Sequence, residues 1–333
     1  MGRAGLNRKT ALATAVLTIS AEIADIDILT EVNGPVYGFA HHRGWTHSFI
    51  GAPVMAALAV AVVLAFDRWW PWRRKPRALP VRIGWLYGFA LLGALVHILL
   101  DFTNSYGVRP FLPFNYRWYH WDIVNIVDPV ILLFLLAGLV MPKLFSLINE
   151  EIGARRAPGR AWPITALVLL VALWGFRDYE HRRAIAMMSS LEYGEGLPIR
   201  LSAFPAAITP FTWYGVVENE SSYITFSVDT IKAEVDPSGH ARTWRKQPET
   251  QASLAAKRSY AGRVYLDWSD YPYIEVEPII STAGHRVIFL DLRYGYLSRT
   301  ALAMEVDLDK DLNVTGTVSG GYFHDRRLRP ASQ

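Results

Sequence analysis

The most apolar stretches of the chain all lie in its first 180 residues, and they are long enough, or nearly so, to cross a bilayer. A hydrocarbon core of about 30 Å requires about 20 helical residues, because a helix rises about 1.5 Å per residue. The last two stretches are short, so flanking aromatic residues or local thinning of the bilayer must compensate. The pattern predicts about five membrane spans, at residues 10–28, 48–66, 83–100, 126–141 and 162–176.

The pattern changes after Arg177, where apolar and polar residues begin to alternate with a period of two. This alternation is typical of strands with one buried face. Residues 250–259 are expected to form one short helix. We therefore expect an α-helical multi-pass membrane bundle at residues 1–180 and a β-rich domain at residues 181–333. The candidate strands are residues 222–228, 263–268, 273–276, 286–292, 301–307 and 312–318.

Basic residues in the links between the spans predict the orientation of the bundle. Cytoplasmic links are enriched in Lys and Arg. The links at residues 67–82 and 142–161 are basic, whereas the loops at residues 29–47 and 101–125 carry only three arginines between them. We therefore expect both basic links in the cytoplasm, and a fifth crossing then makes the β-rich domain extracytoplasmic. The basic residues concerned are Arg68, Arg73, Arg74, Lys75, Arg77, Arg82, Lys143, Arg155, Arg156 and Arg160.

A cleavable signal peptide is the alternative interpretation of the first apolar stretch, because Arg3, Arg8 and Lys9 precede it. A signal peptide ends at a small-x-small cleavage site, and no clean site of this kind precedes Glu22. We therefore interpret the stretch as a retained span.

Composition narrows the classes of function that the chain can have. The 34 Lys and Arg residues exceed the 30 Asp and Glu residues by four, so no strong basic field favours nucleic-acid binding. Hydrophobic residues make up 51% of the sequence, in agreement with a lipid bilayer as the main partner. The absence of cysteine excludes thiolate metal sites and a cysteine nucleophile, which leaves His, Asp and Glu as the strong metal ligands.

Three groups of such residues occur near the ends of the predicted spans that face away from the basic links. Glu22, Asp25 and Asp27 end the first apolar stretch, three histidines precede the second, and His97 and Asp101 stand one helical turn apart at the end of the third. Each group alone is explained by interfacial placement or by hydrogen bonds between helices. Because the predicted topology brings all three to one face, together they predict a metal site. The three histidines are His41, His42 and His47.

Arg43 and Arg109 are candidates for holding an anionic substrate, because a guanidinium group offers a planar fork of donors to a phosphate or carboxylate. The alternative is that both simply mark the membrane interface. Asp128 stands beside Pro129 at the start of the fourth apolar stretch, so we expect it to complement a helix N-terminus.

Four motifs, read in order between the spans, give the chain a resemblance to a known family. It resembles the bacterial inner-membrane, metal-dependent hydrolases described as LexA-regulated or YdjM-like, from about residue 5 to about residue 180. The β-rich tail is similar to an extension that some members carry. The motifs are Asp25-Ile-Asp27, His42-Arg-Gly-Trp-Thr-His-Ser48, His97-x-x-x-Asp101 and Ser105-Tyr-Gly107 with Pro110-Phe111.

The resemblance implies a set of site residues. The implied metal-site candidates are Asp25, Asp27, His42, His47, His97 and Asp101, of which we assign all but Asp25 as metal ligands. Asp25 and Asp101 are the candidate catalytic carboxylates, and which carboxylate is a ligand and which a base stays open. The implied residues around the metal or facing the substrate are Arg43, Thr46 and Ser48, to which we add Arg109.

The chain departs from the family pattern at two places. The Pro-Asp-x-Asp block of the family is here Ala24-Asp25-Ile-Asp27, which keeps both carboxylates. Family members usually open with a Met-Asp-x-x-Thr-His segment on an extra apolar helix, whereas this chain starts at the Arg-Lys turn that follows it. We therefore expect that the start is assigned too late and that a helix with one histidine ligand precedes Met1.

The leading hypothesis is a hydrolase with a divalent metal, zinc by ligand preference, or manganese or magnesium if carboxylates predominate. Its position at the outer membrane surface suggests a lipid, or a lipid-linked phosphate or ester, as substrate. The alternative is a noncatalytic membrane protein with a structural or sensory metal site and a partner-binding β domain. A transporter fits less well, because the acidic residues and histidines gather at one face instead of at the midplane.

Overall fold

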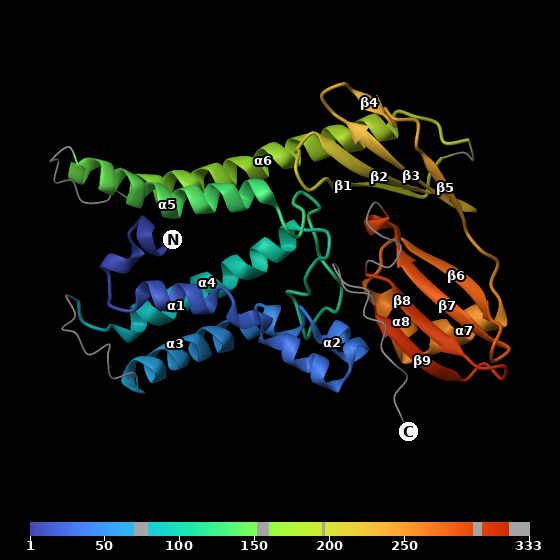
Figure 1. The fold of residues 1–333 in the computed structure, drawn as a ribbon, viewed down its shortest axis with the longest axis horizontal. Coiled ribbons are helices and arrows are strands. Elements are labelled where there is room, and N and C mark those ends of the chain that lie inside the picture. Colours follow the sequence, from blue (N-terminus) through green and yellow to red (C-terminus); the bar gives the residue numbers. More distant parts are fainter. Residues whose placement is uncertain (70–78, 152–159, 195–196, 296–301, 320–333) are drawn as a thin grey trace. The chain divides into compact units, whose positions relative to one another are not determined.

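The computed structural model describes residues 1–69, 79–151, 160–194, 197–295 and 302–319 (Figure 1). The chain forms two compact units. The helical unit comprises Met1–Asp27 and Arg43–Tyr179, and the β-rich unit comprises Ile28–His42 and Glu180–Gln333. Six of the basic link residues lie outside the described residues, namely Arg73, Arg74, Lys75, Arg77, Arg155 and Arg156.

Four long apolar helices form most of the helical unit, and they confirm the later four predicted spans. They are α3 (Gly51–Trp69), α4 (Ile83–Thr103), α5 (Pro129–Glu151) and α6 (Ala161–Ser189). Within the described residues, these four helices are the ones long and apolar enough to cross a membrane. The last part of α6 belongs to the β-rich unit.

The first apolar stretch differs from the predicted single span. It folds as α1 (Ala13–Ser20), which follows the short turns η1 (Gly2–Ala4) and η2 (Leu6–Arg8), and the chain then continues as the 3-10 helix η3 (Ile23–Asn33). The α-helix ends just before the acidic residues of this stretch begin. Carboxylates are costly on an apolar helix, whereas the irregular backbone directs them into a polar site.

Close packing holds α1 against α4. A Cβ atom on Gly93 would stand only 2.0 Å from the Oγ atom of Ser20, so a larger residue at this position would collide with α1. At one end of the contact the Ala11 amide donates to the Pro80 carbonyl (3.1 Å), and at the other end His97 Nδ1 lies 2.5 Å from the Ala21 carbonyl oxygen. The segment therefore follows α4 over most of its length.

Small residues allow the helices to approach one another closely. The core of the helical unit is formed by the alanine-rich face of α3 against α4 and α1. Its buried residues are Val16, Ala56, Ala59, Val60, Val63, Leu86 and Ala90. A second cluster joins α5, α6 and the loop before α5, through Ile123, Val124, Ile131 and Leu170.

Two antiparallel sheets build the β-rich unit. The first contains β1 (Arg200–Pro205), β2 (Thr212–Glu218), β3 (Ser222–Asp229) and β4 (Glu234–Val235) in that order, and β5 (Arg242–Arg245) pairs with β3. The second has the order β6 (Pro272–Ile279), β7 (Gly284–Asp291), β8 (Met304–Leu308) and β9 (Val314–Ser319). The helices α7 (Gln251–Arg258) and α8 (Tyr260–Trp268) connect the sheets, and η6 (Leu292–Tyr294) follows β7. Aromatic and aliphatic side chains from both sheets share one core, which includes Phe204, Val216, Tyr223, Trp244, Tyr271, Ile288 and Leu290.

One predicted strand is wrong. Residues 263–268 lie in α8, where Ala261, Tyr265 and Trp268 are buried at helical spacing. The Ser259 hydroxyl accepts a hydrogen bond from the Gly262 amide and caps this helix, a signal that outweighs the short alternation of apolar residues. The helix predicted at residues 250–259 is confirmed as α7, and the other five candidate strands overlap β3 and β6 to β9.

Part of the loop between the first two predicted spans belongs to the β-rich unit. Its helix α2 (Pro35–His41) packs on α8, where Phe39 meets Trp268 edge-on with ring centroids 5.2 Å apart. Gly38 in α2 contacts Glu31 so closely that a Cβ atom would stand 2.4 Å from the Glu31 Cγ atom.

Candidate metal centre

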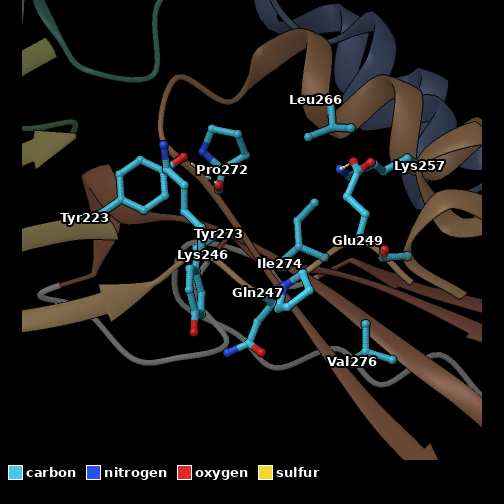
Figure 2. A pocket seen from close by; sticks show the side chains of 12 residues that line it. Tyr223, Lys246, Gln247, Glu249, Lys257, Leu266, Pro272, Tyr273, Ile274 and Val276 are labelled. Carbon is cyan, nitrogen blue, oxygen red and sulfur yellow. Dashed lines mark hydrogen bonds and ion pairs between the residues drawn. The ribbon is translucent and has the colours of Figure 1, made fainter. Parts of the chain in front are cut away.

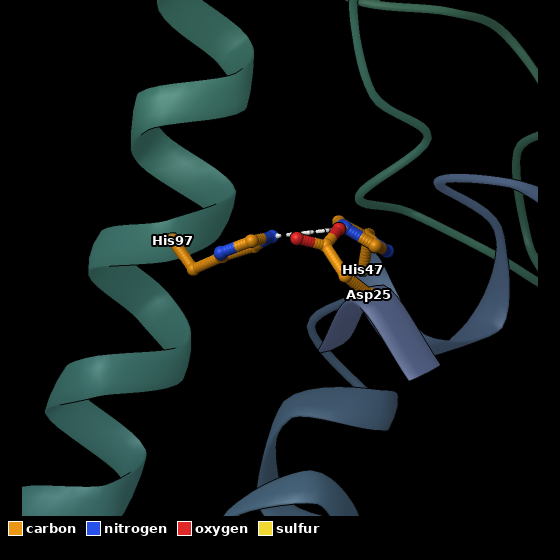
Figure 3. Close-up of side chains that lie close together, drawn as sticks. All are labelled: Asp25, His47 and His97. Carbon is orange, nitrogen blue, oxygen red and sulfur yellow. Dashed lines mark hydrogen bonds and ion pairs between the residues drawn. The ribbon is translucent and has the colours of Figure 1, made fainter. Parts of the chain in front are cut away.

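Three segments of the helical unit bring imidazole and carboxylate groups together. Asp25 and Asp27 lie on η3, His47 ends the 3-10 turn η4 (Trp45–His47), and His97 and Asp101 lie on the last turns of α4. Figure 3 shows the rings of His47 and His97 and the carboxylate of Asp25 turned toward one another. The spacing of His97 and Asp101 places both on one face of α4.

Three atoms that can coordinate a metal surround the Nε2 atom of His47. This atom lies 3.0 Å from His97 Nε2, 3.2 Å from Asp25 Oδ1 and 3.3 Å from Asp101 Oδ2. His97 Nε2 in turn lies 3.5 Å from both Asp25 Oδ1 and Asp101 Oδ2. All five separations that involve a histidine therefore fall between 3.0 and 3.5 Å.

The other nitrogen of each imidazole faces an acceptor. His47 Nδ1 lies 3.1 Å from Asp27 Oδ2, which also accepts from the Thr46 hydroxyl (2.8 Å). His97 Nδ1 lies 2.5 Å from the carbonyl oxygen of Ala21. A carboxylate and a carbonyl can only accept, so each Nδ1 carries a proton, and a cation that displaces the proton of Nε2 would meet the lone pair of that nitrogen.

Arg43 holds one side of the centre in place. Its backbone has the left-handed conformation, with a φ of 54°, and its amide donates to Asp27 Oδ2 (2.9 Å). Its guanidinium pairs with Asp101 Oδ1 (2.9 Å) and donates to Asn104 Oδ1 (3.1 Å). Asp101 Oδ1 is thereby occupied, whereas its buried Oδ2 atom accepts no hydrogen bond and points to the two histidines.

The surrounding carboxylates favour positive charge at this position. Burial lowers the pKa of His47, but hydrogen bonds to Asp25 and Asp27 and the charge of Asp101 outweigh it and raise that pKa to about 9. Burial raises the pKa of Asp25, but hydrogen bonds from His47 and His97 outweigh it and hold the Asp25 pKa below its ordinary range. The His47 side chain is fully buried, whereas Asp25 is 45% exposed and forms the open edge of the centre.

The donor set fits a divalent cation. Two imidazole nitrogens and two carboxylate oxygens face one another, and with the Nε2 protons displaced all four atoms would coordinate one cation. Neighbouring donor atoms stand about 3 to 3.5 Å apart when they share an ion at about 2.0 to 2.2 Å, the usual Zn–N and Zn–O distances. Asp25, His47 and His97 form one of the groups that could hold an ion, and Asp101 Oδ2 approaches the same two nitrogens.

The two carboxylates of η3 contact different nitrogens of the histidines, and their roles as ligand or base stay predictions. Asp27, the expected ligand, bonds the outer nitrogen of His47, whereas Asp25, the expected catalytic carboxylate, faces both Nε2 atoms. His42 ends the segment that belongs to the β-rich unit, so its assignment as a ligand stays a prediction.

The other candidates have contacts of their own. The Ser48 hydroxyl accepts from the Gly51 amide (2.9 Å) at the start of α3 and donates to the Trp45 carbonyl, and these contacts fix the turn that carries His47. Arg109 is buried and stacks on the Trp118 ring at 4.5 Å. Asp128 accepts from the Val130 and Ile131 amides at the N-terminus of α5, as expected.

Two contributors were missed by sequence reasoning. Asn104 accepts through Oδ1 from Arg43 and from the Tyr106 amide (2.9 Å), so it orients the arginine that holds Asp101. Its place just after Asp101 was the available signal. The Ala21 carbonyl that orients His97 is a backbone group, and no side-chain pattern marks it.

Comparison with known proteins agrees with the resemblance of the motifs. The model of the YdjM inner membrane protein family matches residues 1–184. The chain belongs to this family. As a YdjM-family member with four helices of spanning length, it is an inner-membrane protein. It is also similar to the uncharacterized protein YfhP of Bacillus subtilis (strain 168), with 23% identity over 98% of this chain and 90% of YfhP. No solved structure matches the chain significantly.

Proposed function

We propose that this YdjM-family protein is a membrane-bound, metal-dependent hydrolase. The observation that carries the proposal is the convergence of His47 Nε2, His97 Nε2, Asp25 Oδ1 and Asp101 Oδ2, four atoms that can all coordinate one cation. The buried Asp101 oxygen that accepts no hydrogen bond supports the same conclusion, because such a group is costly without a cation.

Asp25, His47, His97 and Asp101 would hold a divalent cation, with zinc favoured by the two imidazoles and manganese or magnesium by the two carboxylates. Such a cation supplies Lewis acidity, which activates water for attack near neutral pH. The protein fixes the ligands through a second layer of contacts. Asp27 and the Ala21 carbonyl hold the two imidazoles, and Arg43 holds Asp101.

Asp25 is the group placed to accept a proton from the attacking water. It is the most exposed of the four ligating residues, so water and substrate reach the centre on its side. Its Oδ1 atom faces the histidines, which leaves Oδ2 for the proton. Arg43 lies beside it with a side chain that is 11% exposed, and its guanidinium offers charge to an anionic substrate near the reacting atoms.

The substrate class follows from the position of the centre in the helical unit. His97 and Asp101 end α4, whereas the basic residues that the structure describes in the links, Arg68 and Arg82 among them, lie at the other ends of α3 and α4. With that basic end in the cytoplasm, the centre and the β-rich unit are extracytoplasmic. A lipid, or a lipid-linked phosphate or ester, is therefore the substrate class proposed.

Metal content is the direct test of the centre. The full chain is purified in detergent and dialysed against trace zinc and manganese, and its metal is measured by inductively coupled plasma mass spectrometry. We expect about one ion per chain in the wild type and almost none in His47→Ala, since His47 contacts the other three ligands. His41→Ala is the matched control, because this histidine is half-buried and stacks on Tyr37 away from the four converging atoms.

Activity separates the hydrolase from a structural or sensory metal site. Hydrolysis of bis-p-nitrophenyl phosphate and p-nitrophenyl butyrate is followed with the metal-loaded protein. We expect turnover in the wild type and a loss of about 100-fold or more in Asp25→Asn at saturating metal, as for removal of a general base. Bound metal without turnover on phosphate, ester or lipid substrates would favour the noncatalytic alternative. Equal metal in His47→Ala and the wild type would contradict the centre itself.

A further inference from the structure

A second polar feature of the helical unit is a cationic hollow of about 340 Å³, far along the bundle from the metal centre. Its walls come from η1 and η2, from α5 at Lys143 and from the first turn of α6. The chain leaves the metal centre through the loop after α4 and enters α5 at Pro129, so the later half of α5 lies toward the opposite end of the bundle. The four cations that line the hollow are Arg3, Arg8, Lys143 and Arg160.

The N-terminal turns are seated directly on α5 and α6. The Arg3 guanidinium donates to the Leu139 carbonyl on α5 (3.0 Å). Gly5 has a φ of +134°, and a Cβ atom there would stand 2.9 Å from Arg160 Nη1, so the turn passes immediately beside this guanidinium. The hollow is therefore a packed feature of the fold, formed by three segments that are distant in the sequence.

The four cations carry the same sign of charge. None of them forms an ion pair with a carboxylate among the side chains that the structure describes. A hollow of similar volume in the β-rich unit, drawn in Figure 2, has a different charge balance. Its lysines are neutralised, Lys246 by Glu218 (2.9 Å) and Lys257 by Glu249. Four like charges in one hollow repel one another, so the helical unit gains from an anion at this position.

The surface beside the cationic hollow is apolar. Phe145 on α5 stacks on Trp162 of α6, with ring centroids 5.3 Å apart, and both rings are partly exposed. Leu144 and Ile164 are exposed next to them. Aromatic rings beside basic residues are typical of the boundary between headgroups and acyl chains.

We propose that this hollow binds the phosphate of an anionic phospholipid, with the acyl chains on the apolar surface of α5 and α6. Basic hollows between helices at the cytoplasmic surface suit such headgroups. A free phosphate shares the charge but lacks the chains that Phe145 and Trp162 would contact. This site does not depend on the metal centre or on the hydrolase activity.

Lipid titration followed by native mass spectrometry tests the proposal. The full chain in detergent is titrated with dioleoyl-phosphatidylglycerol, dioleoyl-phosphatidylcholine or inorganic phosphate. We expect one tightly bound phosphatidylglycerol and no comparable phosphatidylcholine. Arg8→Gln/Arg160→Gln should weaken phosphatidylglycerol binding by about 30-fold, because each basic residue at an anionic lipid surface contributes about a factor of five.

The matched control is Arg68→Gln/Arg82→Gln, which removes the same charge from two described arginines outside the hollow. Retained affinity in this control, with unchanged gel-filtration profiles of both variants, supports the site. An equal loss of phosphatidylglycerol affinity in both variants would show that only the net charge of the protein matters, and it would overturn the proposal. Equal affinity for both lipids would also overturn it, as would full displacement of phosphatidylglycerol by inorganic phosphate.

Discussion

Each unit contains a buried cluster of charged residues, and the two clusters differ in how completely their polar atoms are paired. In the β-rich unit, Arg293 and Asp291 have side chains that are 1% and 0% exposed. Asp291 accepts from the Ser269 hydroxyl, the Asp270 amide and the backbone and side chain of Arg293, and Arg293 also donates to the Trp268 carbonyl. The cluster is complete in itself.

The cluster in the helical unit is equally buried at His47, but its converging atoms are imidazole nitrogens and carboxylate oxygens, all of which can coordinate a cation. His47 Nε2 and His97 Nε2 lie 3.0 Å apart with their outer nitrogens engaged, and an Asp101 oxygen faces them without a hydrogen bond. Buried charge alone therefore does not identify a functional site. The balance of donors and acceptors does, because a cluster that satisfies itself has no need of a ligand.

The largest expected effect is on the free energy of unfolding, when the Arg293–Asp291 pair is broken. Arg293→Met leaves Asp291 buried without its cation, which should cost about 3–5 kcal/mol in the free energy of unfolding. Metal content should not change. Denaturant unfolding of the full chain in detergent, followed by tryptophan fluorescence, measures the cost, since Trp268 contacts Arg293.

Arg293→Met/Asp291→Leu is the companion variant, because removing both partners of a buried pair is less harmful than removing one. It should recover at least half of the lost stability. A double variant that is less stable than Arg293→Met would contradict the interpretation of this cluster as a self-sufficient ion pair.

A smaller effect is expected on the metal affinity of the candidate metal centre. Asp27→Asn keeps the shape of the residue but removes the carboxylate that fixes His47 Nδ1. Loss of such an outer partner should weaken metal binding by about 10–100-fold. Competition with a chromophoric chelator measures the affinity.

Asp178→Asn serves as the control for Asp27→Asn, because it removes one carboxylate charge from the same unit. Asp178 accepts from the Trp121 indole (2.8 Å) and is not one of the residues of the centre. Equal metal affinities in Asp27→Asn and Asp178→Asn would show that Asp27 does not orient His47.

Most of the helical fold follows from the sequence, because long apolar runs have few alternatives to spanning helices. The first run is an exception, since whether α1 continues depends on where Asp25 and Asp27 find partners, and those partners lie more than fifteen residues away in His47 and Arg43. The strand predicted at residues 263–268 failed for a local reason. Six residues cannot separate a period of two from a helical face, and the Ser259 cap decides.

The sequence indicates which residues lie near the candidate site better than it indicates what each of them does there. The spacing of His97 and Asp101 and the charge of the links indicate which groups share one end of the bundle. The sequence does not distinguish Asp25 from Asp27, because two residues apart on irregular backbone can face either way. The left-handed backbone of Arg43 and the Ala21 carbonyl are tertiary features, so the contacts that fix the ligands emerge only from the fold.

The smallest expected effect on the free energy of unfolding concerns two partly exposed salt bridges in the β-rich unit. Glu218 accepts from Arg200 (2.9 Å) and Lys246 (2.9 Å). Burial raises the pKa of Glu218, but these hydrogen bonds outweigh it and hold the pKa below its ordinary value. The stabilisation is therefore present above the unfolded-state pKa and is lost as the pH falls through the folded-state value.

Glu218→Gln should accordingly lower the free energy of unfolding by about 1 kcal/mol at pH 7, because ion bridges near a surface contribute little. The difference from the wild type should shrink as the pH falls through the lowered folded-state pKa of Glu218, where the wild-type carboxylate takes up its proton. Urea unfolding of the full chain across this pH range measures this, with the exposed Glu234→Gln as control. A difference that does not change with pH would show that packing of the side chain, and not its charge, stabilises this edge of the sheet. The ion pairs of the β-rich unit would then stabilise it less through charge than the comparison with the metal centre assumes.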